Sequence, residues 1–181
     1  GSVQIAGPST VEQMQQIVLD MRAFGAERVL IDGAIFRRSI ANPTLCDAVA
    51  LAVGAAYHAD MARVVNDAGF LCDIMSLPLY DGQAEARVIE GALTDAMAEE
   101  LLREEPRPLV LMDPSRALLG EAAYQRLRRR GIALYVQDKP ELLFVSANPY
   151  SPYGAGFSRA AFIAALSARL PVPVFDAKEA M

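Results

Sequence analysis

The sequence holds few of the residues that usually build nucleophile or metal sites. Its 181 residues include one histidine, His58, and two cysteines, Cys46 and Cys72, which form no CxxC pair. One histidine is too few for a His-rich metal site, and the sequence excludes a histidine-based catalytic triad; two distant cysteines argue against a disulfide framework. We interpret both cysteines as small core residues and His58 as a solvated residue at a helix start. The low cysteine content is typical of a reducing cytoplasm.

Long apolar runs and an excess of positive charge are also missing. No apolar run reaches the ~18 residues of a membrane-spanning helix, so we expect no membrane segment. The 22 acidic and 17 basic residues give a net charge of −5, which argues against a nucleic-acid-binding module. The sequence contains no GxxxxGK[ST] motif, so it carries no P-loop of its own.

The composition is that of a folded chain with a sizeable core. Hydrophobic residues make up 53% of the sequence and charged residues 22%. We interpret Gly1-Ser2 as the scar of an expression tag and expect a single α/β domain over residues 3–181. An alternative is a duplication into similar halves, 3–91 and 92–181, because Val29-Leu30-Ile31-Asp32 is echoed by Val110-Leu111-Met112-Asp113.

Strand-like and helix-like segments alternate along the chain, which predicts a largely parallel sheet covered by helices on both faces. We expect about seven or eight strands in a three-layer sandwich. Predicted strands are 3–6, 28–32, 70–77, 87–89, 109–113, 132–136, 142–147 and 172–175, the last at a sheet edge because Pro173 cannot donate to a central ladder. Predicted helices are 10–24, 43–53, 61–69, 93–105, 117–130 and 158–170.

Ligands of parallel sheets bind beyond the carboxyl ends of the strands, so we place the candidate site in the loops that follow those ends. The predicted ligand-binding residues are Ser9, Asp32, Gly33, Arg37, Arg38, Ser39, Asp113, Asn148, Ser151 and Tyr153. We expect Asp32, Asp113 and the loop after Ala147 to lie at one edge of the sheet. No residue is assigned a catalytic role.

Each of these loops has a functional and a structural interpretation. Asp32 could hold Mg²⁺ while Arg37 and Arg38 bind a phosphate or carboxylate, or Asp32 could form an ion pair with Arg37 or Arg38 that shapes the loop. Asp113 could join a shared site or cap the next helix, and Ser9 could line an anion site or serve as a plain cap. The two prolines and two tyrosines of the loop 148–154 suit either a ligand contact or a rigid cover.

Five motifs in order resemble one known family. They are Val3-Gln4-Ile5-Ala6-Gly7-Pro8-Ser9, Ile31-Asp32-Gly33-Ala34-Ile35-Phe36-Arg37-Arg38-Ser39, Gly54-Ala55-Ala56, Asn148-Pro149-Tyr150-Ser151-Pro152-Tyr153-Gly154 and Pro173-Val174-Phe175-Asp176. Together they resemble the C-terminal region of the reactivase of adenosylcobalamin-dependent lysine 5,6-aminomutase. The match spans nearly the whole chain.

The resemblance implies a chaperone-like role in lysine fermentation, in which ATP is used to restore an aminomutase whose cobalamin is damaged. It implies the aminomutase or a second reactivase subunit as partner, and a homo-oligomer is a further option. Members of the family begin with a P-loop region that this chain lacks, so we expect ATP and Mg²⁺ to be used elsewhere in the full protein and no cofactor in this chain. Two alternatives remain: a ligand-sensing module for a small anionic metabolite, and a small Mg²⁺-dependent enzyme acting on a phosphorylated substrate through Asp32 and Asp113.

Overall fold

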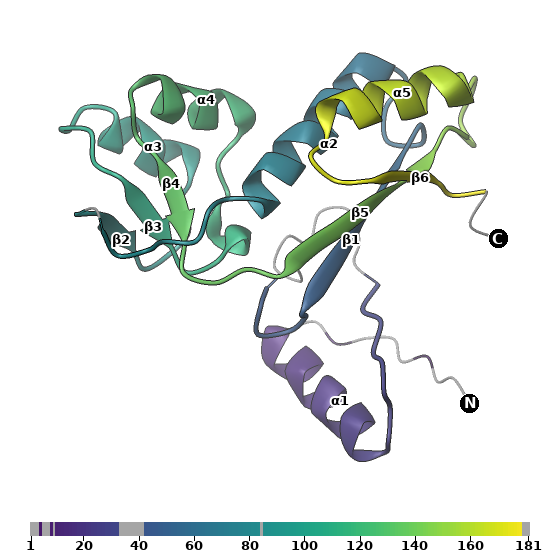
Figure 1. Cartoon of the computed structure of the whole chain (residues 1–181), viewed down its shortest axis with the longest axis horizontal. Helices are drawn as coiled ribbons and strands as arrows, with labels where there is room; N and C mark the ends of the chain where they lie inside the picture. The colour runs from purple at the N-terminus through teal and green to yellow at the C-terminus, as the bar shows by residue number, and fades with distance from the viewer. Residues whose placement is uncertain (1–3, 5–7, 9, 33–41, 84, 179–181) are drawn as a thin grey trace.

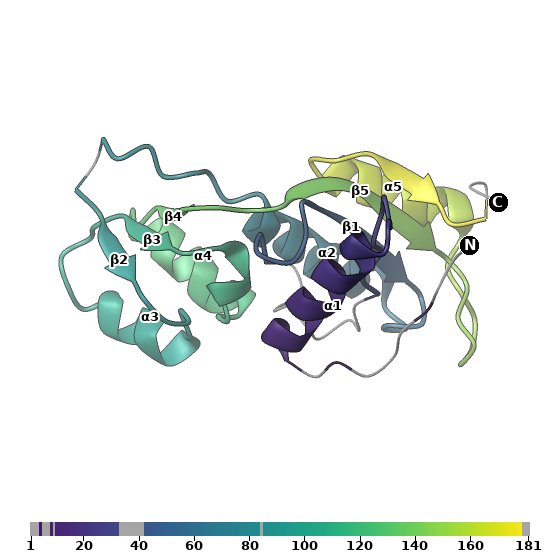
Figure 2. The same ribbon diagram turned by 90° about the horizontal axis from the view of Figure 1, so that it is seen from below.

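The structure is a computed structural model of residues 1–181, and it describes residues 4, 8, 10–32, 42–83 and 85–178. Within these residues the chain is mixed α/β, and its strands form two small parallel sheets of three strands each. The two sheets lie side by side along the long axis of the molecule (Figures 1 and 2).

Sheet A contains the first strand and the last two. Its order is β1 (Ala48–Gly54), β5 (Glu141–Asn148) and β6 (Val174–Asp176), all parallel. Two helices, α2 (Met61–Met75) and α5 (Arg159–Arg169), lie on one side of this sheet, and α1 (Val11–Ala23) lies on the other side (Figure 1). Sheet A is therefore built from segments far apart in the sequence.

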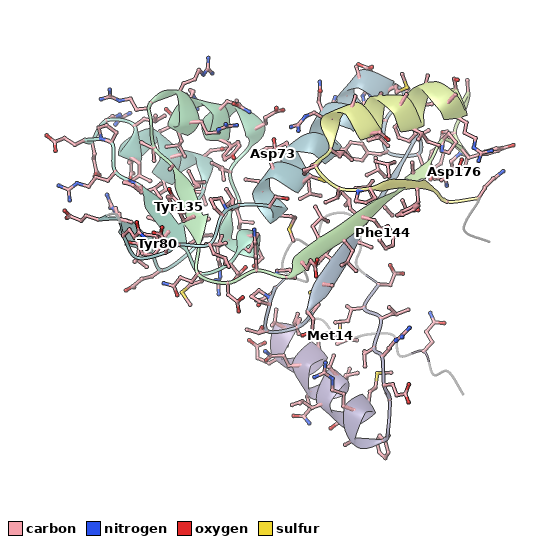
Figure 3. All side chains as sticks on the ribbon, viewed as in Figure 1. Met14, Asp73, Tyr80, Tyr135, Phe144 and Asp176 are labelled. Atoms are coloured by element: carbon pink, nitrogen blue, oxygen red, sulfur yellow. The ribbon has the colours of Figure 1, made fainter. Side chains whose placement is uncertain are left out.

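Sheet B is built from consecutive segments. Its order is β2 (Arg87–Ile89), β3 (Leu109–Leu111) and β4 (Leu134–Val136), with α3 (Asp95–Leu101), the short 3-10 helix η2 (Pro114–Arg116) and α4 (Glu121–Arg129) between the strands. Leu79 adds a parallel bridge to Val136. Tyr80, which follows Leu79, packs edge to face with Tyr135 of β4, and their ring centroids are 5.9 Å apart (Figure 3).

Sheet B belongs to a module inserted between α2 and β5, here called the inserted module (residues 78–138). The segments on either side of it meet, because the Lys139 ammonium donates to the carbonyl oxygens of Leu77 at 2.6 Å and Ser76 at 3.4 Å. These carbonyls follow the end of α2, where a cation is favourably placed against the helix dipole. The module thus leaves and returns to the same point of the chain.

Two hydrophobic cores correspond to the two sheets, and α2 contributes to both. Core A lies between sheet A and its helices, and core B fills the inserted module. On α2, Ala68 and Cys72 belong to core A, whereas Phe70 and Ile74 belong to core B. Because these residues share the same two turns, α2 is a structural part of both cores.

Helices α2 and α5 are joined by a partly buried ion pair. The Arg169 guanidinium donates to both carboxylate oxygens of Asp73, at 3.2 Å and 2.6 Å (Figure 3). The guanidinium lies against Gly69, where a Cβ atom would clash with it. Gly69 is therefore a packing residue in the middle of α2, which explains why the expected helix end at this glycine is wrong.

Most of the other predicted elements are confirmed. The helix capped by Thr10, strand 87–89, the strands that became β3, β4 and β5, the edge position of β6 and the helix after Ser158 are all observed. Two further expectations are wrong. Residues 70–75 continue α2 and residues 76 and 77 follow its end, so no strand forms there. The predicted helix 43–53 is wrong because residues 48–53 belong to strand β1, whose pairing with β5 overrides the helix propensity of its alanines.

Residues 28–32 also differ from the expectation, since they are not in a strand. The expected strand 3–6 lies largely outside the described residues. In the part of the chain that the structure describes, no helix is long and apolar enough to cross a membrane.

Candidate functional site

The carboxyl ends of the three strands of sheet A meet at one edge. In the strand register Gly54 lies beside Asn148, and Ala147 lies beside Asp176. The Ala55 amide donates to the Asn148 carbonyl oxygen at 2.9 Å, so the ladder continues past the end of β1. This is the kind of edge at which parallel sheets bind ligands, and we call it the carboxyl edge.

The loop after β5 is held by its own hydrogen bonds. The Asn148 side-chain oxygen accepts from the Tyr150 amide at 3.0 Å, and Ser151 Oγ accepts from the Tyr153 amide at 3.2 Å. The Phe157 amide donates to the Pro149 carbonyl oxygen at 2.9 Å and closes the loop. The backbone is thus fixed while the Tyr153 side chain is 87% exposed and Tyr150 is also exposed.

A hollow of about 530 Å³ lies between this loop, the start of α5 and the end of β6. Tyr150, Arg159, Asp176 and Lys178 line it. Asp176 is buried, its carboxylate forms an ion pair with Arg159, and it accepts from the Lys178 amide at 2.8 Å (Figure 3). The Lys178 ammonium lies 4.2 Å from the centroid of the Tyr150 ring. Two cations therefore face one carboxylate in this hollow.

The environment of Asp176 favours its charged form. The Lys178 backbone N–H lowers the pKa of the Asp176 carboxyl, burial raises it, and the Arg159 guanidinium lowers it, with a net decrease below the ordinary value. Asp176 is therefore a carboxylate at neutral pH. It neutralises part of the positive charge of the hollow and fixes the Arg159 guanidinium at the start of α5.

A larger pocket of about 860 Å³ lies on the other side of the loop, beside β1 and α2. Its walls are mostly apolar, and its polar side chains are those of Tyr57, Arg63, Asp67, Ser146, Asn148 and Tyr153. The Tyr57 hydroxyl donates to Asp67 at 3.0 Å, and Arg63 Nε lies 3.7 Å from the same carboxylate oxygen. Three of the six polar side chains thus bind one another, and most of the remaining lining is apolar.

The predicted site residues fall into three groups. Asn148, Ser151 and Tyr153 lie together in the loop at the carboxyl edge. Asp32 is exposed and follows no strand, and Asp113 follows β3 of sheet B. The remaining predicted residues lie outside the described residues: Ser9, Gly33, Arg37, Arg38 and Ser39.

The expectation of one shared edge is wrong for Asp113 and Asn148, because they follow strands of different sheets. Asp113 is buried, accepts from the Ser115 amide at 2.8 Å and lies 3.8 Å from Arg116 Nε. Its interpretation as a helix cap is confirmed by the 3-10 helix that it caps. In the described ranges no three histidine, cysteine or carboxylate side chains come together as metal ligands, so Asp32 has no such partners there for Mg²⁺.

Sequence reasoning missed several residues at the carboxyl edge. Tyr57 and Arg63 were overlooked because residues 43–53 were expected to be helical, so the loop after Gly54 was not recognised as following a strand. Asp176 had a usable signal, since it directly follows the strand that was predicted at 172–175. No pattern in the sequence pointed to Arg159, whose role depends on the position of Asp176.

Comparisons with protein-family models, with curated proteins and with solved structures found no match for this chain.

Proposed function

We propose that this chain is a reactivase domain that acts on the adenosylcobalamin-dependent lysine 5,6-aminomutase by protein–protein contact. One observation carries the proposal. The motifs 54–56, 148–154 and 173–176, which are spread over more than a hundred residues of sequence, come together at the carboxyl edge of sheet A. The three motifs that resemble the reactivase family therefore form one surface of the domain.

The chemistry of that surface suits a protein partner. Tyr150 and Tyr153 are exposed on a loop whose backbone is already fixed by internal hydrogen bonds. Exposed tyrosines on a stiff loop give a large contact area at low entropic cost, which is why tyrosine is enriched at interfaces. In this proposal the partner is the aminomutase or a second reactivase subunit, the protein acts in the cytoplasm, and ATP and Mg²⁺ are used by another part of the full protein.

The proposal includes the larger fold expected from the sequence. A domain of seven or eight strands with helices on both faces would extend the two three-stranded sheets, and sheet A has room for this because one side of its edge strand β1 has no strand partner among the described residues.

The test is a binding measurement between the chain and purified aminomutase by isothermal titration calorimetry. Replacing both Tyr150 and Tyr153 with alanine should weaken binding by tenfold or more, because interface tyrosines carry a large share of binding energy. Leu118→Ala is the matched control, since Leu118 is an exposed apolar residue of the inserted module. No binding of the unaltered chain to the aminomutase or to a second reactivase subunit, or equal binding by the double variant, would overturn the proposal.

A second candidate function is the binding of a small anionic ligand, and the hollow at Arg159 and Lys178 favours it. Two cations face one carboxylate there, and charge-assisted contacts to a phosphate or carboxylate contribute roughly 1.5–3 kcal/mol each. Titration with inorganic phosphate tests this function. Saturable binding that disappears in Lys178→Met would support it, and no heat of binding at millimolar phosphate would reject it.

A further inference from the structure

The outer side of β1 is an open sheet edge within the described residues. β1 pairs with β5 on one side, and no described strand pairs with it on the other. From Ala48 to Gly54 the strand has no charged residue and no proline, although these are the usual protection of an exposed edge. A seven-residue neutral edge of this kind is a template for another strand.

The surface beside this edge is apolar. The pocket of about 860 Å³ runs along β1 from Leu51 to Gly54, and its opposite wall is formed by Val64, Ala68 and Leu71 of α2. Tyr57 and Arg63 contact Asp67 at one end of it, Ser146 and Asn148 line it from β5, and the β1 residues that line it are all apolar. The length of the pocket beside β1 therefore suits an extended apolar segment.

The chain contains one such segment close by. Residues 28–32, Arg-Val-Leu-Ile-Asp, have three consecutive large aliphatic residues between two charged ones, and two of the three are β-branched. Such residues favour strands. In the structure this segment is in no strand, and Leu30 is 96% exposed. An exposed aliphatic segment and an open apolar edge thus occur in the same chain.

The direction of the chain fits a parallel addition. The Arg22 guanidinium lies 3.6 Å from the Asp47 carboxylate, and the Gln15 side-chain amide donates to the Thr44 carbonyl oxygen at 3.4 Å. These contacts hold α1 beside the residues that precede β1. A strand that starts six residues after Arg22 can therefore begin at the amino end of β1 and run along it.

The lengths also agree. Five residues of strand span roughly 16 Å, which is shorter than the seven residues of β1. The 15 residues from 33 to 47 exceed the dozen that a crossover between parallel strands requires.

We propose that residues 28–32 dock as a fourth, parallel strand on the open edge of β1. Because side chains alternate along a strand, Val29 and Ile31 then cover the apolar pocket beside α2, and Leu30 lies on the opposite face of the sheet with the exposed side chains of β1. The outward-facing amides of β1 gain hydrogen-bond partners. Asp32 is carried to the carboxyl edge, where Gly54 and Asn148 end their strands. The docked strand therefore brings the start of the second family-like motif to the edge where three others already meet, and it goes beyond the proposed function because it concerns the sheet itself.

Disulfide trapping tests the proposal directly. In a chain carrying Cys46→Ser and Cys72→Ala, Leu30→Cys is combined with Ala50→Cys or with Ala52→Cys, two exposed positions of β1 that allow for the register. Cα atoms on adjacent strands lie within the range that a disulfide can bridge. Mild oxidation should give an intramolecular disulfide in at least one pair. Leu30→Cys with Phe175→Cys, an exposed residue of β6 at the opposite edge of the same sheet, is the matched control and should not form one.

Hydrogen exchange of the unaltered chain provides a second measurement that no variant can disturb. Docking predicts that amides of residues 29–31 exchange at least a hundredfold more slowly than in an unstructured peptide. It also predicts that the β1 amides that point toward the open edge are protected as well as those that point toward β5. Leu30→Pro should remove the protection at 29–31 while β5 stays protected. A disulfide that forms only between two chains would assign the edge to a second copy and overturn the proposal, as would fast exchange at 29–31 together with no intramolecular disulfide.

Discussion

Replacing Ile74 with alanine should weaken both cores, although the side chain belongs to only one. Ile74 is 1% exposed, lies on the last turns of α2 and packs in core B of the inserted module. Truncating a buried isoleucine to alanine costs about 2–5 kcal/mol of unfolding free energy, through lost burial and the cavity left behind. We expect about 3 kcal/mol here.

The location of Ile74 on a shared helix determines where that loss appears. Cys72, two residues earlier, is fully buried in core A, so the turn that carries Ile74 also holds a core A residue. Core B cannot lose this turn without removing Cys72 from core A. The two cores should therefore unfold together, as one cooperative unit.

Native-state hydrogen exchange measured by mass spectrometry shows whether the two cores unfold together or separately. In Ile74→Ala, the slowest amides of β3 in sheet B and of β5 in sheet A should both exchange faster by on the order of a hundredfold, which corresponds to about 3 kcal/mol. The control Leu118→Ala removes an exposed side chain from the same module and should leave both strands unchanged. If β3 loses protection while β5 keeps it, the cores unfold separately and the reasoning from α2 fails.

Two further predictions concern titratable groups. Burial raises the pKa of the Cys72 thiol to about 11, so at pH 8 only about one molecule in a thousand carries the reactive thiolate. In Cys46→Ser, Ellman's reagent should therefore leave Cys72 unmodified in the native chain and modify it at once in denaturant; rapid native labelling would show that the thiol is accessible. Asp176 has a lowered pKa in the folded chain, so its contribution to stability is present above the unfolded-state value of about 3.9 and is lost as the pH falls through the folded value. The difference in unfolding free energy between the unaltered chain and Asp176→Asn, measured by urea unfolding, should narrow as the pH falls from about 5 to about 2. A difference that stays constant over this range would contradict the role of the ionised carboxylate. Asp47→Asn, which removes an exposed carboxylate, controls for net charge.

The elements that could be predicted from the sequence are those with strong local signals. Thr10 and Thr94 accept hydrogen bonds from amides three residues on, at the starts of α1 and α3, and both helices lie within predicted segments. The predicted strand 109–113 is observed over 109–111, where all three residues are buried. Local chemistry and tertiary packing agree at these positions, so pattern reasoning succeeds.

The errors occur where tertiary contacts override local preference. Alanine-rich β1 is helix-forming by composition, but it lies in a sheet because β5 pairs with it. Gly69 signals a helix end, but it lies within α2 because Arg169 occupies the space where a side chain would be. Neither partner is near in sequence, so no local pattern could reveal either contact.

In the candidate site, too, residues with a local sequence signal could be predicted and residues placed by tertiary contacts could not. Asn148, Ser151 and Tyr153 could be proposed because their loop has a distinctive composition. Arg159 could not be proposed, because its position depends on an ion pair with Asp176 from another element. Expecting a single sheet also placed Asp113 at the same edge as Asn148, whereas the chain divides its strands between two sheets.

The contact of Lys139 with the end of α2 has a consequence for how this chain tolerates changes in length. Because the two ends of the inserted module meet, residues 78–138 can be excised and replaced by a tight turn at little cost in loop closure. What remains is a βαβαβ unit of β1, α2, β5, α5 and β6 with its own core. Such a minimal chain would need polar residues in place of Phe70 and Ile74, whose partners leave with the module. The same geometry makes this point a natural site for grafting a foreign domain onto the β1–β5–β6 scaffold.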